Sequence, residues 1–309
     1  MTGTPRPPHP AARRHAAAAL AVAALAYLAS LAVLMREPGA PLVEPLFLLV
    51  VLGVAFPLLA WGLTHRRGQA TPPALDAPPR LPGVLLYLAV FALVVLGWGF
   101  SVVNAAFPHE PAQSVAQLLV KGATMVALPL WLFTRATGRG PFGTGRLLAV
   151  FVVMSLAYFG LQAVFGRGLG TLAELAPAAA TLAWAIPACW LWQVLEAGLA
   201  EEVLFRRVLQ EKLSLATGSH VAAVAWASLL FGLAHAPGLW MRGGHLMEGA
   251  AQASPAWAVA YSIAMVAPAG IAFGVLWART RSLWLVVLLH GSVDLIPQLA
   301  PFIRAWTGA

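Results

Sequence analysis

Three short motifs place ionisable side chains in a chain that is otherwise almost uncharged. In chain order they are Glu201-Glu202-x-x-x-Arg206, Phe231-x-x-x-His235 and His290-x-x-x-Asp294. An ionisable group inside a membrane span costs roughly 2.5–3.5 kcal/mol, and such groups usually mark a functional cavity. Carboxylates and imidazoles are also the side chains that most often accept and return protons in catalysis. The three motifs together therefore predict a site that activates water.

The composition places these motifs in a membrane. The 309 residues are 60% hydrophobic and only 10% charged, with a mean hydropathy of +0.80, whereas a soluble domain carries about 25% charged residues. The net charge is +8, but the basic residues form no cluster with interleaved aromatics, so no nucleic-acid partner is expected. The single cysteine, Cys189, excludes an intramolecular disulfide and argues against a cysteine metal site.

Runs of about 20 apolar residues predict the membrane-crossing helices. The expected spans cover residues 16–35, 42–63, 83–103, 114–133, 146–165, 178–199, 219–236, 255–277 and 283–303. The predicted fold class is all-α, a polytopic transmembrane helical bundle of eight or nine spans. With nine spans, 14 of the 19 Lys and Arg residues fall on one side and 4 on the other, and Lys121 lies within a span. This bias predicts a multi-pass protein of the cell (inner) membrane with a cytoplasmic N-terminus.

The first motif divides its two carboxylates between two tasks. Glu202 and Arg206 are four residues apart, so on a helix they share a face and can pair. Glu201 lies about 100° around the helix and is left to face a cavity as a candidate general base. The alternative is that both glutamates lie in a cytoplasmic loop beside Arg207 and Lys212.

The other two motifs supply the remaining groups of a hydrolytic site. Glu201 and His235 could hold and deprotonate a water, while His290 and Asp294 could position or stabilise a developing oxyanion. The same side chains allow a second interpretation, because His and carboxylate are ordinary zinc ligands. Glu201, His235 and His290 would then bind a divalent metal such as zinc.

The three motifs, in this order and on separate spans, resemble those of the CAAX protease and bacteriocin-processing (CPBP) family. That family contains intramembrane proteases, including the type II CAAX prenyl endopeptidases. The resemblance covers roughly residues 178–303, where Leu204-Phe205-Arg206 and the Gly270-x-x-x-Gly274 pair agree as well. It implies a catalytic transmembrane core over 171–309. The polar, Pro-rich N-terminus predicts a disordered tail over residues 1–15, and the apolar runs predict N-terminal transmembrane helices over 16–170.

The resemblance also implies a role for each motif residue. Glu201 and His235 would activate the water, Glu202 and Arg206 would support them, and His290 with Asp294 would form the oxyanion site. The family often has Asn where this chain has Asp294, so this carboxyl either is protonated or orients His290. The family has been described both as metalloproteases and as proteases with a glutamate-activated water, and both descriptions remain open here.

The predicted function is hydrolysis of peptide bonds in a membrane-associated peptide or protein, within the lipid bilayer. The Ala-, Arg- and Pro-rich composition is typical of a GC-rich bacterium, which favours a bacterial peptide or membrane-anchored protein over a prenylated substrate. The alternative is a non-hydrolytic membrane protein, either a bacteriocin immunity or binding protein or a proton-coupled transporter. The expected span limits conflict with the motifs, because they put Glu201 at the cytoplasmic end of its helix and His235 near the opposite end of the next. The two residues can meet only if the segment 178–217 lies deeper in the membrane, with Arg207 and Lys212 reaching the surface.

Overall fold

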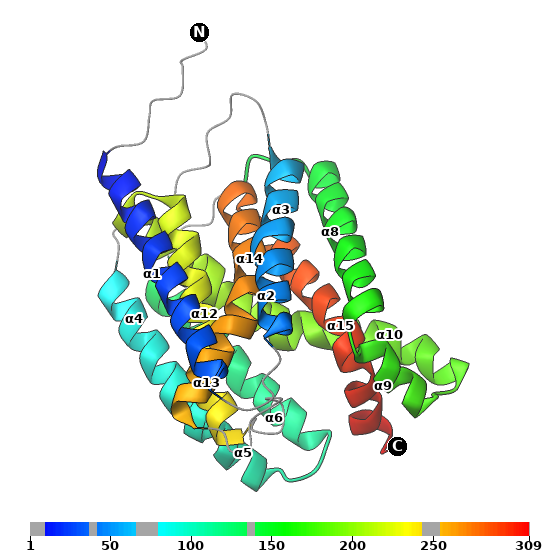
Figure 1. Ribbon diagram of the computed structural model, residues 1–309. Helices are drawn as coiled ribbons and strands as arrows, with labels where there is room; N and C mark the ends of the chain where they lie inside the picture. Colours follow the sequence, from blue (N-terminus) through cyan, green and yellow to red (C-terminus); the bar gives the residue numbers. More distant parts are fainter. Residues whose placement is uncertain (1–9, 37–41, 66–79, 135–139, 243–253, 309) are drawn as a thin grey trace. The chain divides into compact units, whose positions relative to one another are not determined.

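The computed structural model describes residues 10–36, 42–65, 80–134, 140–242 and 254–308 (Figure 1). Within these ranges every regular element is a helix, and nine helical runs are long and apolar enough to cross a membrane. The predicted all-α fold with eight or nine spans is confirmed, and the protein is a multi-pass membrane protein. The first helix begins at Pro10, and residues 1–9 of the expected tail lie outside the described ranges.

The spans are built from α-helices (α) and π-helical segments (η). The nine runs are Pro10–Leu34, Val43–Thr64, Leu81–Ala106, Ala112–Phe133, Thr144–Phe165, Ala179–Thr217, His220–Met241, Pro255–Thr280 and Leu283–Thr307. The helical elements in chain order are α1 (Pro10–Leu34), α2 (Val43–Val50), η1 (Val51–Ala55), α3 (Phe56–Thr64), α4 (Leu81–Val90), η2 (Phe91–Gly99), α5 (Phe100–Ala106), α6 (Ala112–Lys121), η3 (Gly122–Ala127), α7 (Leu128–Phe133), α8 (Thr144–Phe165), α9 (Gly168–Leu175), α10 (Ala179–Gln193), η4 (Val194–Leu199), η5 (Glu202–Gln210), α11 (Glu211–Thr217), α12 (His220–Arg242), α13 (Pro255–Tyr261), η7 (Ser262–Val266), α14 (Ala267–Thr280) and α15 (Leu283–Thr307). The short helix α9 lies between the fifth and sixth runs.

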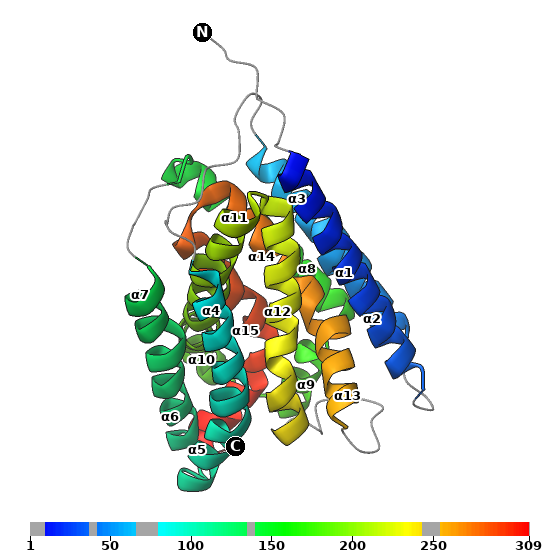
Figure 2. The same ribbon diagram turned by 90° about the vertical axis from the view of Figure 1, so that its left-hand side faces the viewer.

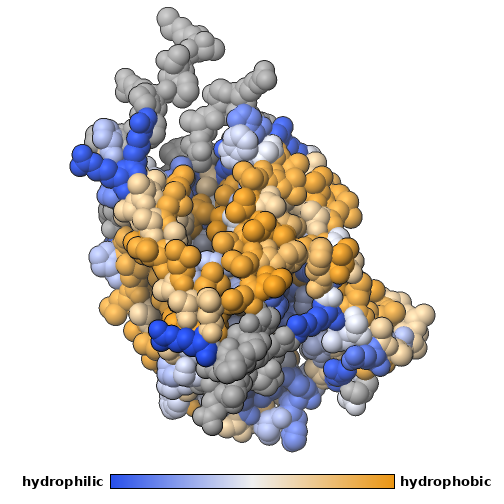
Figure 3. Space-filling model, in the orientation of Figure 1, coloured by the Kyte–Doolittle hydropathy of each residue, from blue (hydrophilic) through white to orange (hydrophobic). Residues whose placement is uncertain are grey.

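The surface has the composition expected of a protein that is dissolved in lipid. Large apolar side chains are exposed on many helices, for example Trp131 at 79%, Leu119 at 69% and Leu86 at 68%. Figure 3 shows that apolar residues occupy much of the face in view. A soluble monomer rarely exposes so much contiguous apolar area, whereas lipid tails solvate it without cost.

The helices form two compact units. The first contains residues 1–102, 131–140 and 205–281, and the second contains residues 103–130, 141–204 and 282–309. In the first unit α12 packs against α1, α13 and α14 (Figure 2). At Gly270 a Cβ atom would lie only 3.2 Å from the Cα atom of Ser228, so glycine lets α14 approach the backbone of α12.

In the second unit α15 is the central helix. It packs against α10, η4, α8 and α9. Two glycines allow the closest approach, because a Cβ atom on Gly198 would lie 2.4 Å from the carbonyl oxygen of Val287, and one on Gly291 would lie 2.4 Å from a side-chain methyl of Val194. The backbones of η4 and α15 therefore touch directly beside the first and third sequence motifs.

The predicted end of the sixth span at residue 199 is wrong. This helical run starts at Ala179, as expected, but continues to Thr217. Its second part carries charged residues that hydropathy assigns to a loop, yet they are buried: Arg206, Arg207, Glu211 and Lys212. Arg281 donates to the Glu211 carboxylate in a buried ion pair. Burial lowers the pKa of Arg281, and Glu211 opposes that shift. Tertiary pairing thus keeps a charged segment helical and inside the protein.

Candidate active site

The second unit brings four of the predicted site residues together around one imidazole ring. His290 Nδ1 donates to Glu202 Oε1 at 2.9 Å. His290 Nε2 lies 3.6 Å from Glu201 Oε2 and 3.5 Å from Asp294 Oδ2. The last contact is the predicted i, i+4 pair on α15. Residues 88 positions apart, on the sixth and ninth spans, therefore form one polar cluster.

The side chains of this cluster differ in their exposure. The side chain of Glu202 is 0% exposed, that of His290 9%, that of Glu201 14% and that of Asp294 29%. Glu202 is thus the inner partner of the ring, while Glu201 and Asp294 lie on its more accessible side.

The geometry around His290 has a consequence for its protons. Carboxylates only accept hydrogen bonds when they are ionised, and an imidazole donates from both nitrogens only when it is doubly protonated. With Glu202 at Nδ1 and two carboxyls near Nε2, an imidazolium places positive charge among all three carboxyls. Nε2–H then becomes a cationic donor on the accessible side of the ring. Such a donor is suited to binding developing negative charge.

The neighbouring helices hold α15 in place around this ring. Trp190 Nε1 donates to Ser292 Oγ at 3.0 Å, which joins α10 to α15. Gln162 on α8 donates to the carbonyl oxygen of Val293. Together with the glycine contact between η4 and α15, these bonds flank His290 on both sides in sequence, so its ring has a defined position relative to the two glutamates.

Lys121 was not among the predicted site residues. This lysine on α6 forms an ion pair with Glu196 of η4 and lies within electrostatic range of Glu201 and Asp294. The signal was present in the sequence, because a lysine inside an apolar span needs a buried partner. The sequence around Lys121 did not indicate which distant carboxylate would pair with it.

The first unit contains the two remaining predicted residues, His235 and Arg206, and joins them through Phe231. The guanidinium carbon of Arg206 lies 5.2 Å from the centroid of the Phe231 ring. The His235 ring contacts the same phenyl ring edge-on at a centroid distance of 4.9 Å, and Phe205 makes a further perpendicular contact at 5.1 Å. Phe231 is therefore the packing centre of its motif.

The tautomer of His235 follows from its backbone contact. Its Nδ1 lies 2.8 Å from the carbonyl oxygen of Phe231, which can only accept, so Nδ1 carries the proton. In the neutral ring Nε2 is then the basic nitrogen. The Phe-x-x-x-His spacing thus provides both a ring contact and a hydrogen bond that orient one base.

The metal interpretation can be tested on ligand geometry. Within the described residues, no group of three or more His, Cys, Asp or Glu side chains is arranged to hold a metal ion. His290 Nδ1 is instead engaged by Glu202. The arrangement observed in the second unit can accept a proton at a carboxylate and donate one from an imidazolium.

Comparison with known proteins identifies this region. The family described as Type II CAAX prenyl endopeptidase Rce1-like matches residues 182–296, a stretch that contains all three motifs. The family resemblance predicted from those motifs is confirmed for this part of the chain. Neither the curated proteins nor the solved structures provided a match.

Proposed function

Because residues 182–296 match the family described as Type II CAAX prenyl endopeptidase Rce1-like, we propose that this protein is an intramembrane endopeptidase with a glutamate-activated water. One observation carries the proposal: His290 is held by Glu202 at one nitrogen and faces Glu201 and Asp294 with the other. A base and a cationic donor therefore lie side by side on the accessible edge of a buried cluster, as peptide hydrolysis requires.

Glu201 is the general base of the proposed reaction. Its carboxylate takes a proton from water while the water oxygen attacks the carbonyl carbon of the scissile peptide bond. The distance of 3.6 Å from Glu201 Oε2 to His290 Nε2 exceeds a direct hydrogen bond. The attack produces a tetrahedral intermediate with its negative charge on the former carbonyl oxygen.

His290 stabilises that oxyanion through Nε2–H. Removing a single donor of this kind typically reduces kcat by about 10²–10³. An ionised carboxylate cannot donate to an oxyanion, so Asp294 acts by orienting the imidazolium from 3.5 Å. This assignment explains how the site tolerates Asp where related sequences often have Asn. Glu202 holds the ring from the buried side.

His235 completes the proton transfers, as the motif order suggests. Its neutral ring presents a basic Nε2, because Nδ1 is bonded to the Phe231 carbonyl. In the proposed reaction, the proton taken from water returns to the nitrogen of the leaving amine as the C–N bond breaks. The products are a carboxylate and an amine. Arg206, stacked on Phe231, supports this base.

The substrate class follows from the surroundings of the site. The residues described here lie in membrane-spanning helices, so a substrate must reach them from the bilayer or its surface. We assign a membrane-associated peptide or protein as the substrate. The apolar helices exclude water elsewhere, which restricts hydrolysis to the polar cluster.

The decisive experiment compares wild type with Glu201→Gln and His235→Ala in proteoliposomes against a library of tail-anchored and peptide substrates. We expect cleavage by wild type and a loss of at least 10² in kcat for each variant, since general acid–base catalysis contributes about 10²–10⁴. Glu174→Gln and His109→Ala are matched controls on exposed positions and should cleave normally.

Two further outcomes are informative. Cleavage that survives both substitutions would remove Glu201 and His235 from the mechanism. If no substrate is cut while the variants retain the phenotype of the wild-type gene, the protein binds without hydrolysing. Incubation with a chelator should leave the wild-type rate unchanged, whereas a loss that zinc restores would support the metal interpretation.

A further inference from the structure

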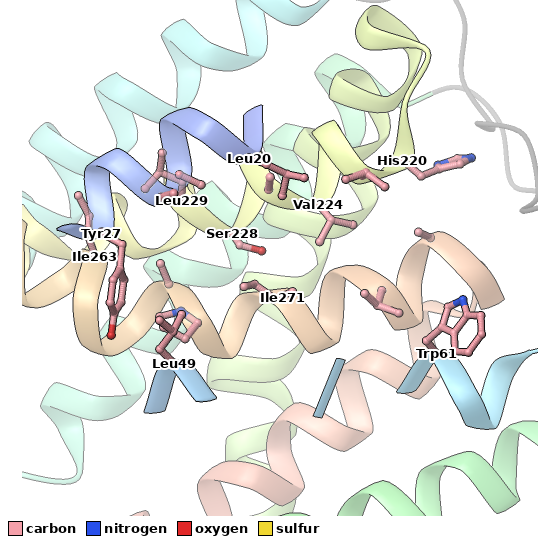
Figure 4. A pocket seen from close by; sticks show the side chains of 18 of the residues that line it. Leu20, Tyr27, Leu49, Trp61, His220, Val224, Ser228, Leu229, Ile263 and Ile271 are labelled. Carbon is pink, nitrogen blue, oxygen red and sulfur yellow. The ribbon is translucent and has the colours of Figure 1, made fainter. Parts of the chain in front are cut away.

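An apolar groove in the first unit has properties that the proposed protease function does not use. Its volume is about 700 Å³, within the range of pockets that bind small molecules. Residues of α1, α12 and α14 form its length, with Leu49 and Trp61 of the second span on the remaining side (Figure 4). All of these elements belong to one compact unit.

The groove opens sideways toward lipid. Three of its lining residues, Leu20, Leu28 and Val221, are 53%, 60% and 51% exposed. They lie in membrane-spanning helices, so bilayer lipid reaches the groove without crossing a polar layer. A peptide would have to bury its backbone hydrogen-bonding groups in such surroundings, which is costly. A hydrocarbon chain carries no such penalty.

One end of the groove is polar and cationic. His220 and Trp61 lie at this end, and Tyr27 and Leu49 lie toward the other (Figure 4). The guanidinium of Arg279, which also lines the groove, has its carbon 6.0 Å from the centroid of the Trp61 ring. Tryptophan and arginine at the end of a transmembrane groove are typical of the level of lipid headgroups.

Arg279 is held in a defined orientation. Its Nε donates to Thr64 Oγ1 and its Nη2 to the Thr64 carbonyl oxygen, both at 2.8 Å. These bonds use one edge of the guanidinium. Among the residues that the structure describes, no acceptor is bonded to the Nη1–Nη2 edge, which presents two parallel donors. Two such donors match the oxygens of a phosphate group.

The same end carries further positive charge. Arg13 and Arg14 lie two turns before Leu20 on α1, and His15 of that helix bonds to the carbonyl oxygen of Thr217, next to His220. Inside the groove, Ser228 is 2% exposed, and its hydroxyl has no hydrogen-bond partner among the described residues. A ligand with both a negative headgroup and ester carbonyl acceptors complements all of these groups.

We propose that this groove is a binding site for one anionic glycerophospholipid of the bilayer. An acyl chain occupies the apolar length between α1, α12 and α14, and the phosphate binds the open edge of Arg279. Each basic residue near the headgroup contributes about 1 kcal/mol toward an anionic lipid. The bound lipid contacts both α1 and α12, the helix that carries His235. The lipid therefore has a structural role and takes no part in the reaction.

The test is native mass spectrometry of the delipidated full-length protein, titrated with dioleoyl phosphatidylglycerol or dioleoyl phosphatidylcholine. Wild type should bind one phosphatidylglycerol at least fivefold more tightly than phosphatidylcholine, as about 1 kcal/mol implies. Arg279→Gln should reduce that preference about fivefold, because it removes one basic residue. Ala225→Phe, which places a ring in the groove, should weaken binding of both lipids at least fivefold.

Two variants serve as matched controls. Ala29→Phe makes the same change on an exposed face of α1 outside the groove, and Arg304→Gln removes an exposed arginine from α15. Both should bind phosphatidylglycerol as wild type does. If Ala225→Phe binds lipid as tightly as wild type, the groove is not the site. Equal wild-type affinity for the two lipids would overturn the headgroup assignment. Ala225→Phe leaves Arg279 intact, so this variant still tests the groove if Arg279→Gln fails to fold.

Discussion

At the scale of single residues, the ionisable side chains His290 and Lys121 lie inside membrane spans and are each in contact with carboxylates. His290 is bonded to Glu202 and faces two more carboxyls, and Lys121 pairs with Glu196. An uncompensated charge in this environment is costly, whereas a paired one is tolerated. Sequence reasoning identified the members with recognisable spacing. It missed Lys121, because a partner 75 residues away leaves no local pattern.

The pair of Lys121 and Glu196 yields a prediction at this scale. We expect Lys121→Met to lower the free energy of unfolding by about 1–3 kcal/mol, because it leaves the Glu196 carboxylate unsatisfied in a largely buried place. The double variant Lys121→Met/Glu196→Gln should recover most of that loss, since both charges are then absent. Denaturant unfolding in detergent micelles measures both. Equal stability of wild type and the single variant would show that the pair is not formed.

At the scale of elements, the active cluster depends on how closely two helices approach. Glu201 follows η4 directly and His290 lies on α15, and their contact requires the two backbones to touch at Gly198 and Gly291. The sequence predicted both helices, because their apolar runs are local. Their separation could not be predicted, since it is set by which small residues face each other after packing.

We therefore expect Gly198→Ala to disrupt the active site, although Gly198 is not itself a site residue. Its added Cβ would meet the Val287 carbonyl oxygen at 2.4 Å, so α15 must move away. Overpacking of this kind typically destabilises a protein by about 1–3 kcal/mol, and we expect a lower Tm together with loss of cleavage. Gly160→Ala on α8 is the matched control, because its Cβ meets nothing within 4 Å. It should be neutral or slightly stabilising. A Gly198→Ala variant with wild-type Tm would contradict the close packing.

The whole molecule is a multi-pass membrane protein with nine candidate spans in the part of the chain that the structure describes. The distribution of Lys and Arg over the loops favours a cytoplasmic N-terminus. With an odd number of spans, the C-terminus then lies on the opposite side of the membrane. The orientation also determines the side from which a substrate enters.

Reporter fusions in a bacterial host measure this orientation. Alkaline phosphatase fused after Ala309 should be active, and green fluorescent protein at the same position should be dark. As an internal control, the same reporters fused after Arg80, following two spans, should give the opposite pattern. Fluorescence at the C-terminal position would show that the N-terminus is not cytoplasmic or that the span number is even.

The sequence alone predicted that this protein resides in the membrane, that it has eight or nine spans, and that three motifs in its C-terminal half resemble those of an endopeptidase family. Hydropathy and residue type are properties of short segments, so these conclusions needed no contacts between distant residues. Only the tertiary structure decided that the sixth helix continues past Glu201 to Thr217, because burial and pairing of its charges override local hydropathy. It also decided that His290 lies between three carboxyls and that Lys121 pairs with Glu196. Those arrangements arise from packing between separate spans, which spacing along one helix does not encode.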